Sequence, residues 1–324
     1  MNEEIREMFS FFEHKYDACV LPLNWEGVKY LGSKQDQTCR FCQRSRPEVT
    51  FKKKAHAIPE MLGNRRLLNH YECDSCNQFF SDMENHLGSY TSFWRAVSQV
   101  RGKRGTPKYK KDLEIQSVDG QLRIGDYIDS PSIINNDENN EIILPGIRDP
   151  YIPVAVYKCF VKMALTLMPE SEIQHFRKTI EWIMEPDHLK MKCPFGLLTF
   201  VQFTPGFKVY RYPCNWLFLR KETAEPTTPY SIYAVCFSSL MFQITIPHCE
   251  CDDNFLAYLN KGGQAKIAAL PSPYYENHPL GPSQIRVKDL SGTDWVRGEK
   301  EYISISYDLK EEILSNQRNN PEEP

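Results

Sequence analysis

The sequence lacks any run close to the about 18 uninterrupted apolar residues that a membrane-spanning helix needs. It also lacks the features of a secretory signal peptide, because acids lie where such a peptide carries lysines and no apolar core follows. No internal repeat is found either. These absences predict a cytoplasmic protein with no membrane partner.

The remaining composition is that of an ordinary globular protein. The 324 residues are 41% apolar and 25% charged, with 22 prolines and 16 glycines, which excludes a collagen, a long coiled coil and a wholly disordered chain. At about 100–200 residues per domain, two domains are expected. We predict a first domain over 1–112, a hairpin and linker over 113–150, and a second domain over 151–324.

Apolar spacing predicts an α+β second domain. A helix is expected to start at Pro153 and continue through the apolar run 154–168, and Pro169 is expected to open another. Residues 195–247 are aromatic and strand-like. The predicted domain is therefore a helical pair packed on an antiparallel sheet.

The first half of the sequence predicts short helices and strands. Residues 3–16 and a segment from about Ser75 have helical patterns, and a further helix is plausible over 89–100. Residues 49–58 are β-branched and aromatic at one end, which favours a strand. Residues 113–124 are two alternating runs joined by Asp119 and Gly120, which is typical of a hairpin.

Positive charge is concentrated in one segment. Residues 39–110 contain 14 Lys and Arg and six acids, a net charge of +8, although the whole chain has a net charge of −3. Such a basic segment is typical of a protein that binds a polyanion. Charge alone is equally consistent with a solvated lysine-rich surface.

Four of the eleven cysteines form two closely spaced pairs. The odd count and the predicted reducing compartment argue against a disulfide framework. Two residues separate Cys39 from Cys42, and two separate Cys73 from Cys76. This spacing predicts a four-thiolate zinc site that is structural, because four sulfurs leave no open coordination position. The zinc would fix the segment between the pairs, which contains His56.

The order of these residues resembles an HNH endonuclease of the ββα-metal class. After the first cysteine pair comes Ala-His-Ala-Ile-Pro-Glu, which contains His56, then Leu-Gly-Asn, and then the second pair followed directly by Asn77. The resemblance covers about residues 36–110. It implies an N-terminal ββα-metal domain with structural zinc. Similar domains are effectors of bacterial anti-phage defence, fused to sensor domains of which some bind cyclic oligonucleotides.

The resemblance also implies roles for individual residues. His56 matches the general base that activates water, and Asn77 matches an Mg²⁺ ligand. The asparagine that orients the histidine matches either Asn64 or Asn69, and we favour Asn64. On a helix, Asn77 and Glu84 share one face, which makes Glu84 the best carboxylate for a hard cation. His86 would lie on the opposite face and is discounted.

One position departs from the family pattern. Many HNH sites have an acid directly before the histidine, and this chain has Ala55. The cation would then depend on Asn77, Glu84, water and the phosphate, with Glu60 as a further candidate. We expect Mg²⁺, with Mn²⁺ or Ni²⁺ as substitutes.

These observations predict a metal-dependent HNH endonuclease that hydrolyses double-stranded DNA with little sequence specificity. A zinc ribbon that binds nucleic acid without cutting it remains the alternative, and DNA against RNA stays open. A second messenger nucleotide or a protein partner is expected at the second domain, and a homo-oligomer is expected as the active form. The basic residues expected to grip phosphates are Lys52, Lys53, Lys54, Arg65, Arg66, Arg101, Lys103 and Arg104.

Overall fold

The structure is a computed structural model that describes residues 3–35, 37–103, 105–118, 121–126, 133–136, 140–204, 209–272 and 283–306. None of the helices in these ranges has the length and apolar character needed to cross a bilayer.

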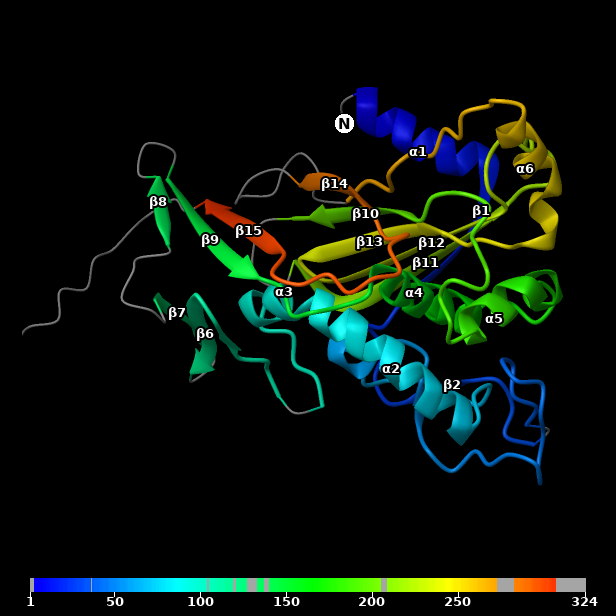
Figure 1. Cartoon of the computed structure of the whole chain (residues 1–324), viewed down its shortest axis with the longest axis horizontal. Helices are drawn as coiled ribbons and strands as arrows, with labels where there is room; N and C mark the ends of the chain where they lie inside the picture. Colours follow the sequence, from blue (N-terminus) through cyan, green and yellow to red (C-terminus); the bar gives the residue numbers. More distant parts are fainter. Residues whose placement is uncertain are drawn as a thin grey trace, which may run out of the picture.

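A six-stranded antiparallel sheet organises the molecule (Figure 1). Its strand order is β1-β11-β12-β13-β10-β14, and every neighbouring pair is antiparallel. The two central strands are buried along their whole length, which explains their nearly continuous apolar sequences. The strands are β1 (Tyr16–Pro22), β10 (Leu198–Phe203), β11 (Tyr210–Arg220), β12 (Ser231–Ser238), β13 (Leu240–Thr245) and β14 (Gln284–Asp289).

Helices cover both faces of this sheet. The predicted helical pair is confirmed on one face as α4 (Pro153–Leu167) and α5 (Arg177–Met184). Pro153 occupies the first helical position, where its missing N–H costs nothing. The second helix does not open at Pro169 as expected, because the chain first forms the short 3-10 helix η3 (Ile173–Phe176). Helix α1 (Glu3–Lys15) packs on the other face through Phe12.

Helix α2 (Asp74–Tyr90) packs on the outer side of α4 (Figure 1). It is followed by the short α3 (Ser92–Val97). Before it, the chain forms a small sheet of order β2-β4-β3, in which β2 and β4 are parallel and β3 and β4 are antiparallel. Its strands are β2 (Lys29–Leu31), β3 (Ala55–His56) and β4 (Leu67–Asn69), and the 3-10 helix η1 (Glu60–Leu62) lies between β3 and β4 in the sequence.

The strand predicted over 49–58 is mostly wrong, since only Ala55 and His56 form a strand. The side chain of Asp74 explains the difference. Its carboxylate accepts the backbone N–H groups of Lys52 and Lys53 and the hydroxyl of Thr50. These backbone donors are therefore satisfied by a side chain at the start of α2 and not by a neighbouring strand.

The remaining strands form two smaller sheets. The predicted hairpin is confirmed as β6 (Leu113–Val118) and β7 (Gln121–Asp126), whose turn residues lie outside the described ranges. Strand β5 (Tyr109–Lys110) extends it. The other sheet has the order β15-β9-β8. It comprises β8 (Ile134–Asn136), β9 (Glu141–Ile147) and β15 (Lys300–Ser306), while η4 (Glu250–Asp252) and α6 (Asp253–Asn260) follow β13.

The hydrophobic core is continuous between the two halves of the chain. One cluster of buried side chains extends from Cys39 and Phe80 to Phe160 and Ile303. In addition, β1 from the N-terminal part is an edge strand of the large sheet. The division at 112 and 150 stays a prediction.

Candidate metal centre and active site

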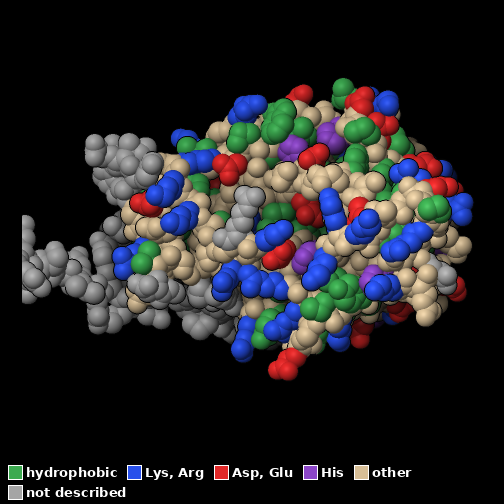
Figure 2. Space-filling model, turned by 90° about the horizontal axis from the view of Figure 1, so that it is seen from below, with side chains coloured by type: hydrophobic (Ala, Val, Ile, Leu, Met, Phe, Trp, Pro, Cys, Tyr) green, Lys and Arg blue, Asp and Glu red, His purple; other side chains and the backbone are tan. Residues whose placement is uncertain are grey.

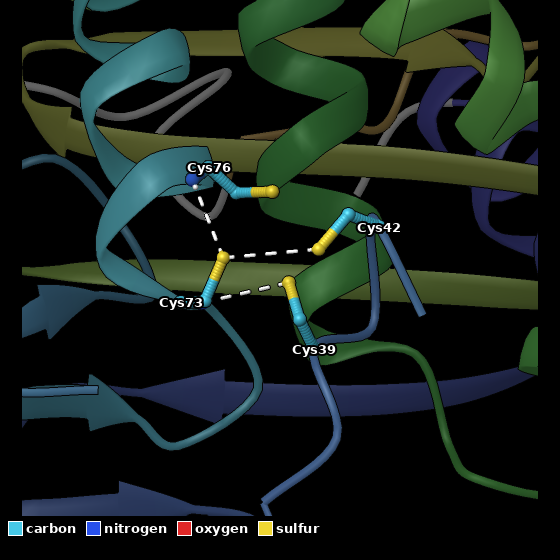
Figure 3. A group of neighbouring side chains, drawn as sticks. All are labelled: Cys39, Cys42, Cys73 and Cys76. Carbon is cyan, nitrogen blue, oxygen red and sulfur yellow. Dashed lines mark hydrogen bonds between the residues drawn. The ribbon is translucent and has the colours of Figure 1, made fainter. Parts of the chain in front are cut away.

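The four paired cysteines converge at the start of α2 (Figure 3). Cys39 and Cys42 come from a tight loop, while Cys73 is the N-cap of α2 and Cys76 lies in its first turn. Their sulfur atoms all lie within 4.8 Å of one another, and the Sγ atoms of Cys42 and Cys73 are 3.8 Å apart. This is the only such cluster of metal-binding side chains among the residues that the structure describes.

The geometry of these sulfurs fits zinc. A tetrahedral site with Zn–S bonds of about 2.3 Å has sulfur–sulfur separations of about 3.8 Å. The backbone N–H of Cys73 points at the sulfur of Cys39, and that of Cys76 at the sulfur of Cys73, each at 3.5 Å. A hydrogen bond from Cys76 lowers the pKa of the Cys39 thiol to about 5, which favours the thiolate that binds metal. The cluster fits a structural zinc site, because four thiolates would leave no coordination position open to substrate.

His56 lies at the edge of a cleft beside this centre. It is the second residue of β3, paired with Leu68 of β4, and its side chain is 26% exposed. Its Nδ1 atom is buried, with no hydrogen-bond partner among the described residues. Its Nε2 atom lies 3.8 Å from a carboxylate oxygen of Glu60, one residue past Pro59 at the start of η1. Nε2 is therefore the ring atom available to a reactant in the cleft.

The surroundings of His56 favour its neutral form. Burial lowers the pKa of His56 below its ordinary value of 6.5. Glu60 opposes this effect, whereas the positive charges of Lys162, Lys103 and Lys54 add to it. A neutral imidazole at neutral pH can accept a proton, as a general base must.

The cleft has a volume of about 930 Å³ and brings several predicted residues together. His56 and Glu60 line one wall, and Asn77, Ser81 and Glu84 of α2 line the other. The side chains of the three α2 residues share a face, as the helical spacing predicts. The oxygen atoms of Asn77, Glu84 and Glu60 are the donors that Mg²⁺ prefers.

Neither asparagine proposed for the middle position lines the cleft. Asn64 is buried, and its amide donates to the carbonyls of Ile58 and Leu67 while its oxygen accepts from the backbone of Arg66 and Leu67. It therefore fixes the loop between β3 and β4. Asn69 lies opposite Ala55 and donates to its carbonyl at 3.4 Å. Both side chains act on the backbone around the histidine.

His86 does not face the cleft. Its Nδ1 atom accepts the backbone N–H of Ile152, and its ring contacts that of Trp295. This agrees with the helical spacing that discounted it as a ligand.

Basic side chains surround the cleft. Figure 2 views the side of the molecule on which α2 lies, and Lys and Arg side chains gather around the hollow in the middle of this face. Lys53, Lys54 and Lys103 line the cleft. A second hollow of about 470 Å³ shares His56 and Glu60 with the cleft and adds Arg65 and Arg101.

The other predicted basic residues have different positions. The side chain of Arg66 donates to the carbonyl of Trp25 and does not line the cleft. Lys52 is exposed and lines neither hollow. Arg104 lies outside the described residues.

Two buried charges beneath the cleft were not found from the sequence. Lys162 of α4 is 1% exposed, and its Nζ atom lies 2.9 Å from Oε2 of Glu72 and 3.8 Å from Oε1 of Glu84. It also donates to the backbone carbonyl of His56 at 3.3 Å. A signal was present, because Lys158 and Lys162 interrupt an otherwise apolar helix and buried lysines need partners.

Comparison with known proteins identifies the region that contains the cleft. Residues 39–89 match the family model of the HNH endonucleases. This part of the chain is similar to an HNH endonuclease domain. The match supports nuclease activity in general and a nucleic-acid substrate. No curated protein and no solved structure matches the chain.

Proposed function

We propose that the protein is a metal-dependent endonuclease that hydrolyses DNA phosphodiester bonds with little sequence specificity. One observation carries the proposal: His56 lies in the same cleft as Asn77 and Glu84, next to the zinc centre of an HNH domain. The zinc centre fixes the start of α2, and the β3–β4 pairing fixes His56, so both walls are positioned before substrate binds.

Each residue of the cleft has a separate role in the proposed hydrolysis. His56 takes the proton of the attacking water at Nε2. Asn77 and Glu84, with Glu60 as a further donor, would hold Mg²⁺, with Mn²⁺ or Ni²⁺ as substitutes. When bound, the cation stabilises the charge that develops on the phosphate and the leaving oxygen. Ala55 supplies no ligand, so the remaining positions go to water and phosphate, which Mg²⁺ tolerates.

Basic residues around the cleft would grip the phosphate backbone. Lys54, Arg65, Arg101 and Lys103 surround His56 in the second hollow. Contacts to phosphates fix register and orientation but carry no direct sequence information. We therefore expect double-stranded DNA of any sequence as the substrate.

The test is cleavage of plasmid DNA by the purified chain with Mg²⁺, with His56→Ala beside it. Loss of a general base costs about 10²- to 10⁴-fold in rate. His70→Ala is the matched control, because His70 is stacked on Tyr30 and lines neither hollow. If the His56→Ala protein cuts as fast as the wild type, the assignment is wrong. A wild type that binds DNA but shows not even slow Mg²⁺-dependent cleavage would favour the non-catalytic zinc ribbon. A parallel RNA substrate tests DNA preference.

We further propose that the nuclease is a defence effector whose second half controls it. A nuclease free to cut host DNA would be lethal, and the chain outside 39–110 carries a net charge of −11 that could mask a basic face. The cytoplasm, where thiols stay reduced and free to bind zinc, is the expected compartment. The signal would be a nucleotide second messenger or a protein partner, and the active form a homo-oligomer. Full-rate plasmid degradation by the isolated chain, with no added factor or assembly, would contradict this control.

A further inference from the structure

A lysine from outside the matched HNH region lies directly beneath the cleft. Lys162 belongs to α4, which packs against α2, and its side chain extends between α2 and the strand that carries His56. Its aliphatic part is buried, and its ammonium group lies over the ring of Phe80, at 5.7 Å from the centroid. Water cannot solvate this charge, so protein groups must stabilise it.

Three acceptors surround the ammonium group. Glu72, which is 3% exposed, forms the closest ion pair at 2.9 Å. Glu84 lies 3.8 Å away and is 28% exposed, since it reaches from Lys162 into the cleft. The third acceptor is the backbone carbonyl of His56. Burial alone would lower the pKa of Lys162, but the charges of Glu72 and Glu84 outweigh it, so the pKa is raised and the group stays charged.

These contacts join the two walls of the cleft. Glu84 is on α2, His56 is on β3, and Lys162 contacts both. The ion pair with Glu72 would be enough to balance the buried charge of Lys162. Stability alone does not require this pair, because replacing a buried ion pair by apolar groups is often neutral. The contacts to Glu84 and to the backbone of His56 act on the groups that the proposed chemistry uses.

We propose that Lys162 is a positioning residue of the nuclease site, which fixes Glu84 and the backbone of His56 in the geometry that binds the cation and activates water. This inference rests on the proposed function. Lys162 itself is buried and does not line the cleft. Its charge is balanced by Glu72, so its effect on Glu84 is mainly one of orientation.

The decisive variant is the double substitution Lys162→Met/Glu72→Gln. The single Lys162→Met change leaves Glu72 buried without its partner and is expected to lower the melting temperature. The double change removes both charges together, which restores stability but not the contacts to Glu84 and His56. Lys158→Met is the matched control, because Lys158 is one turn away on α4, equally buried at 1%, and bonded to the carbonyl of Glu185.

Three measurements are made on each protein: the melting temperature, Mn²⁺ binding followed by electron paramagnetic resonance, and the kcat of plasmid cleavage. Groups that orient metal ligands typically contribute about 10- to 100-fold in metal affinity or activity. We expect the double variant to melt near the wild type while it binds Mn²⁺ and cleaves about 10- to 100-fold less well. Lys158→Met should stay near the wild type in both Mn²⁺ binding and cleavage.

Two results would overturn the inference. If the double variant regains wild-type Mn²⁺ binding and cleavage along with its stability, Lys162 serves packing alone. If Lys158→Met is impaired as much as the double variant, the effect belongs to α4 in general. A folded, zinc-loaded wild type that neither binds Mn²⁺ nor cuts nucleic acid would instead refute the proposed function, and this inference with it.

Discussion

The side chain of Arg40 attaches the loop that carries Cys39 and Cys42, here called the zinc loop, to α4. Removal of this side chain should destabilise the whole protein. Arg40 follows the first zinc cysteine, and its side chain is 3% exposed. Its guanidinium donates to the carbonyls of Leu165, Thr166 and Met168 at 2.7, 3.2 and 2.9 Å. Leu165 and Thr166 lie in the last turn of α4 and Met168 is its C-cap, where no intrahelical donor remains for these carbonyls.

The cost of Arg40→Met can be estimated from these contacts. Hydrogen bonds to charged groups contribute about 1.5–3 kcal/mol each, so the two short ones amount to about 3 kcal/mol at the low end. The ring of Tyr71, 3.7 Å from the guanidinium carbon, adds about 1 kcal/mol. The ion pair with Glu170 adds little, because that carboxylate is 67% exposed. We therefore expect a loss of about 3–4 kcal/mol, a large part of the about 5–15 kcal/mol available to a folded protein.

Thermal and urea unfolding of the zinc-loaded protein measure this loss. With an unfolding entropy of about 2.1 cal/mol/K per residue, a chain of 324 residues loses about 1.5 °C per kcal/mol, so the melting temperature should fall by about 4–6 °C. Arg6→Met is the control, since Arg6 is exposed on α1 and surface substitutions usually stay within about 0.5 kcal/mol. A fall no larger than that of the control would refute the view that the zinc loop and α4 stabilise each other.

Three further predictions concern the site. Cys73→Ser should lower the zinc content and the melting temperature together, as measured by metal analysis and calorimetry, and chelation of the wild type should do the same. Because burial lowers the pKa of His56, kcat at saturating DNA should stay constant through neutral pH and fall only below about pH 6.5. Lys103→Gln removes a charge that lowers this pKa, so the fall of kcat on the acidic side of the pH profile should move to higher pH. Arg101→Ala should weaken DNA binding equally for all sequences and reduce the slope of log K against log salt by about 0.9, measured by anisotropy.

Local sequence patterns predicted those parts of the site in which the residue types and their spacing point to the same structure. Paired cysteines imply convergent sulfurs whatever the rest of the chain does, and the structure brings Cys39 and Cys76 together. Helical spacing predicted that Asn77 and Glu84 line one wall. The strand prediction over 49–58 was wrong because the competing hydrogen bonds come from Asp74, more than 20 residues away.

What the sequence could not supply is the contact between distant segments. Lys162 and Arg40 are ordinary basic residues in the chain, and each acquires its role only from a partner more than 80 residues away in sequence. Their positions depend on how α4 packs against α2 and the zinc loop, which no local pattern encodes. Both link the HNH region to one helix: Arg40 at its C-terminal end and Lys162 in its middle. Under the control that we propose, a signal received by the second half would act on Glu84 and His56 through Lys162 of α4.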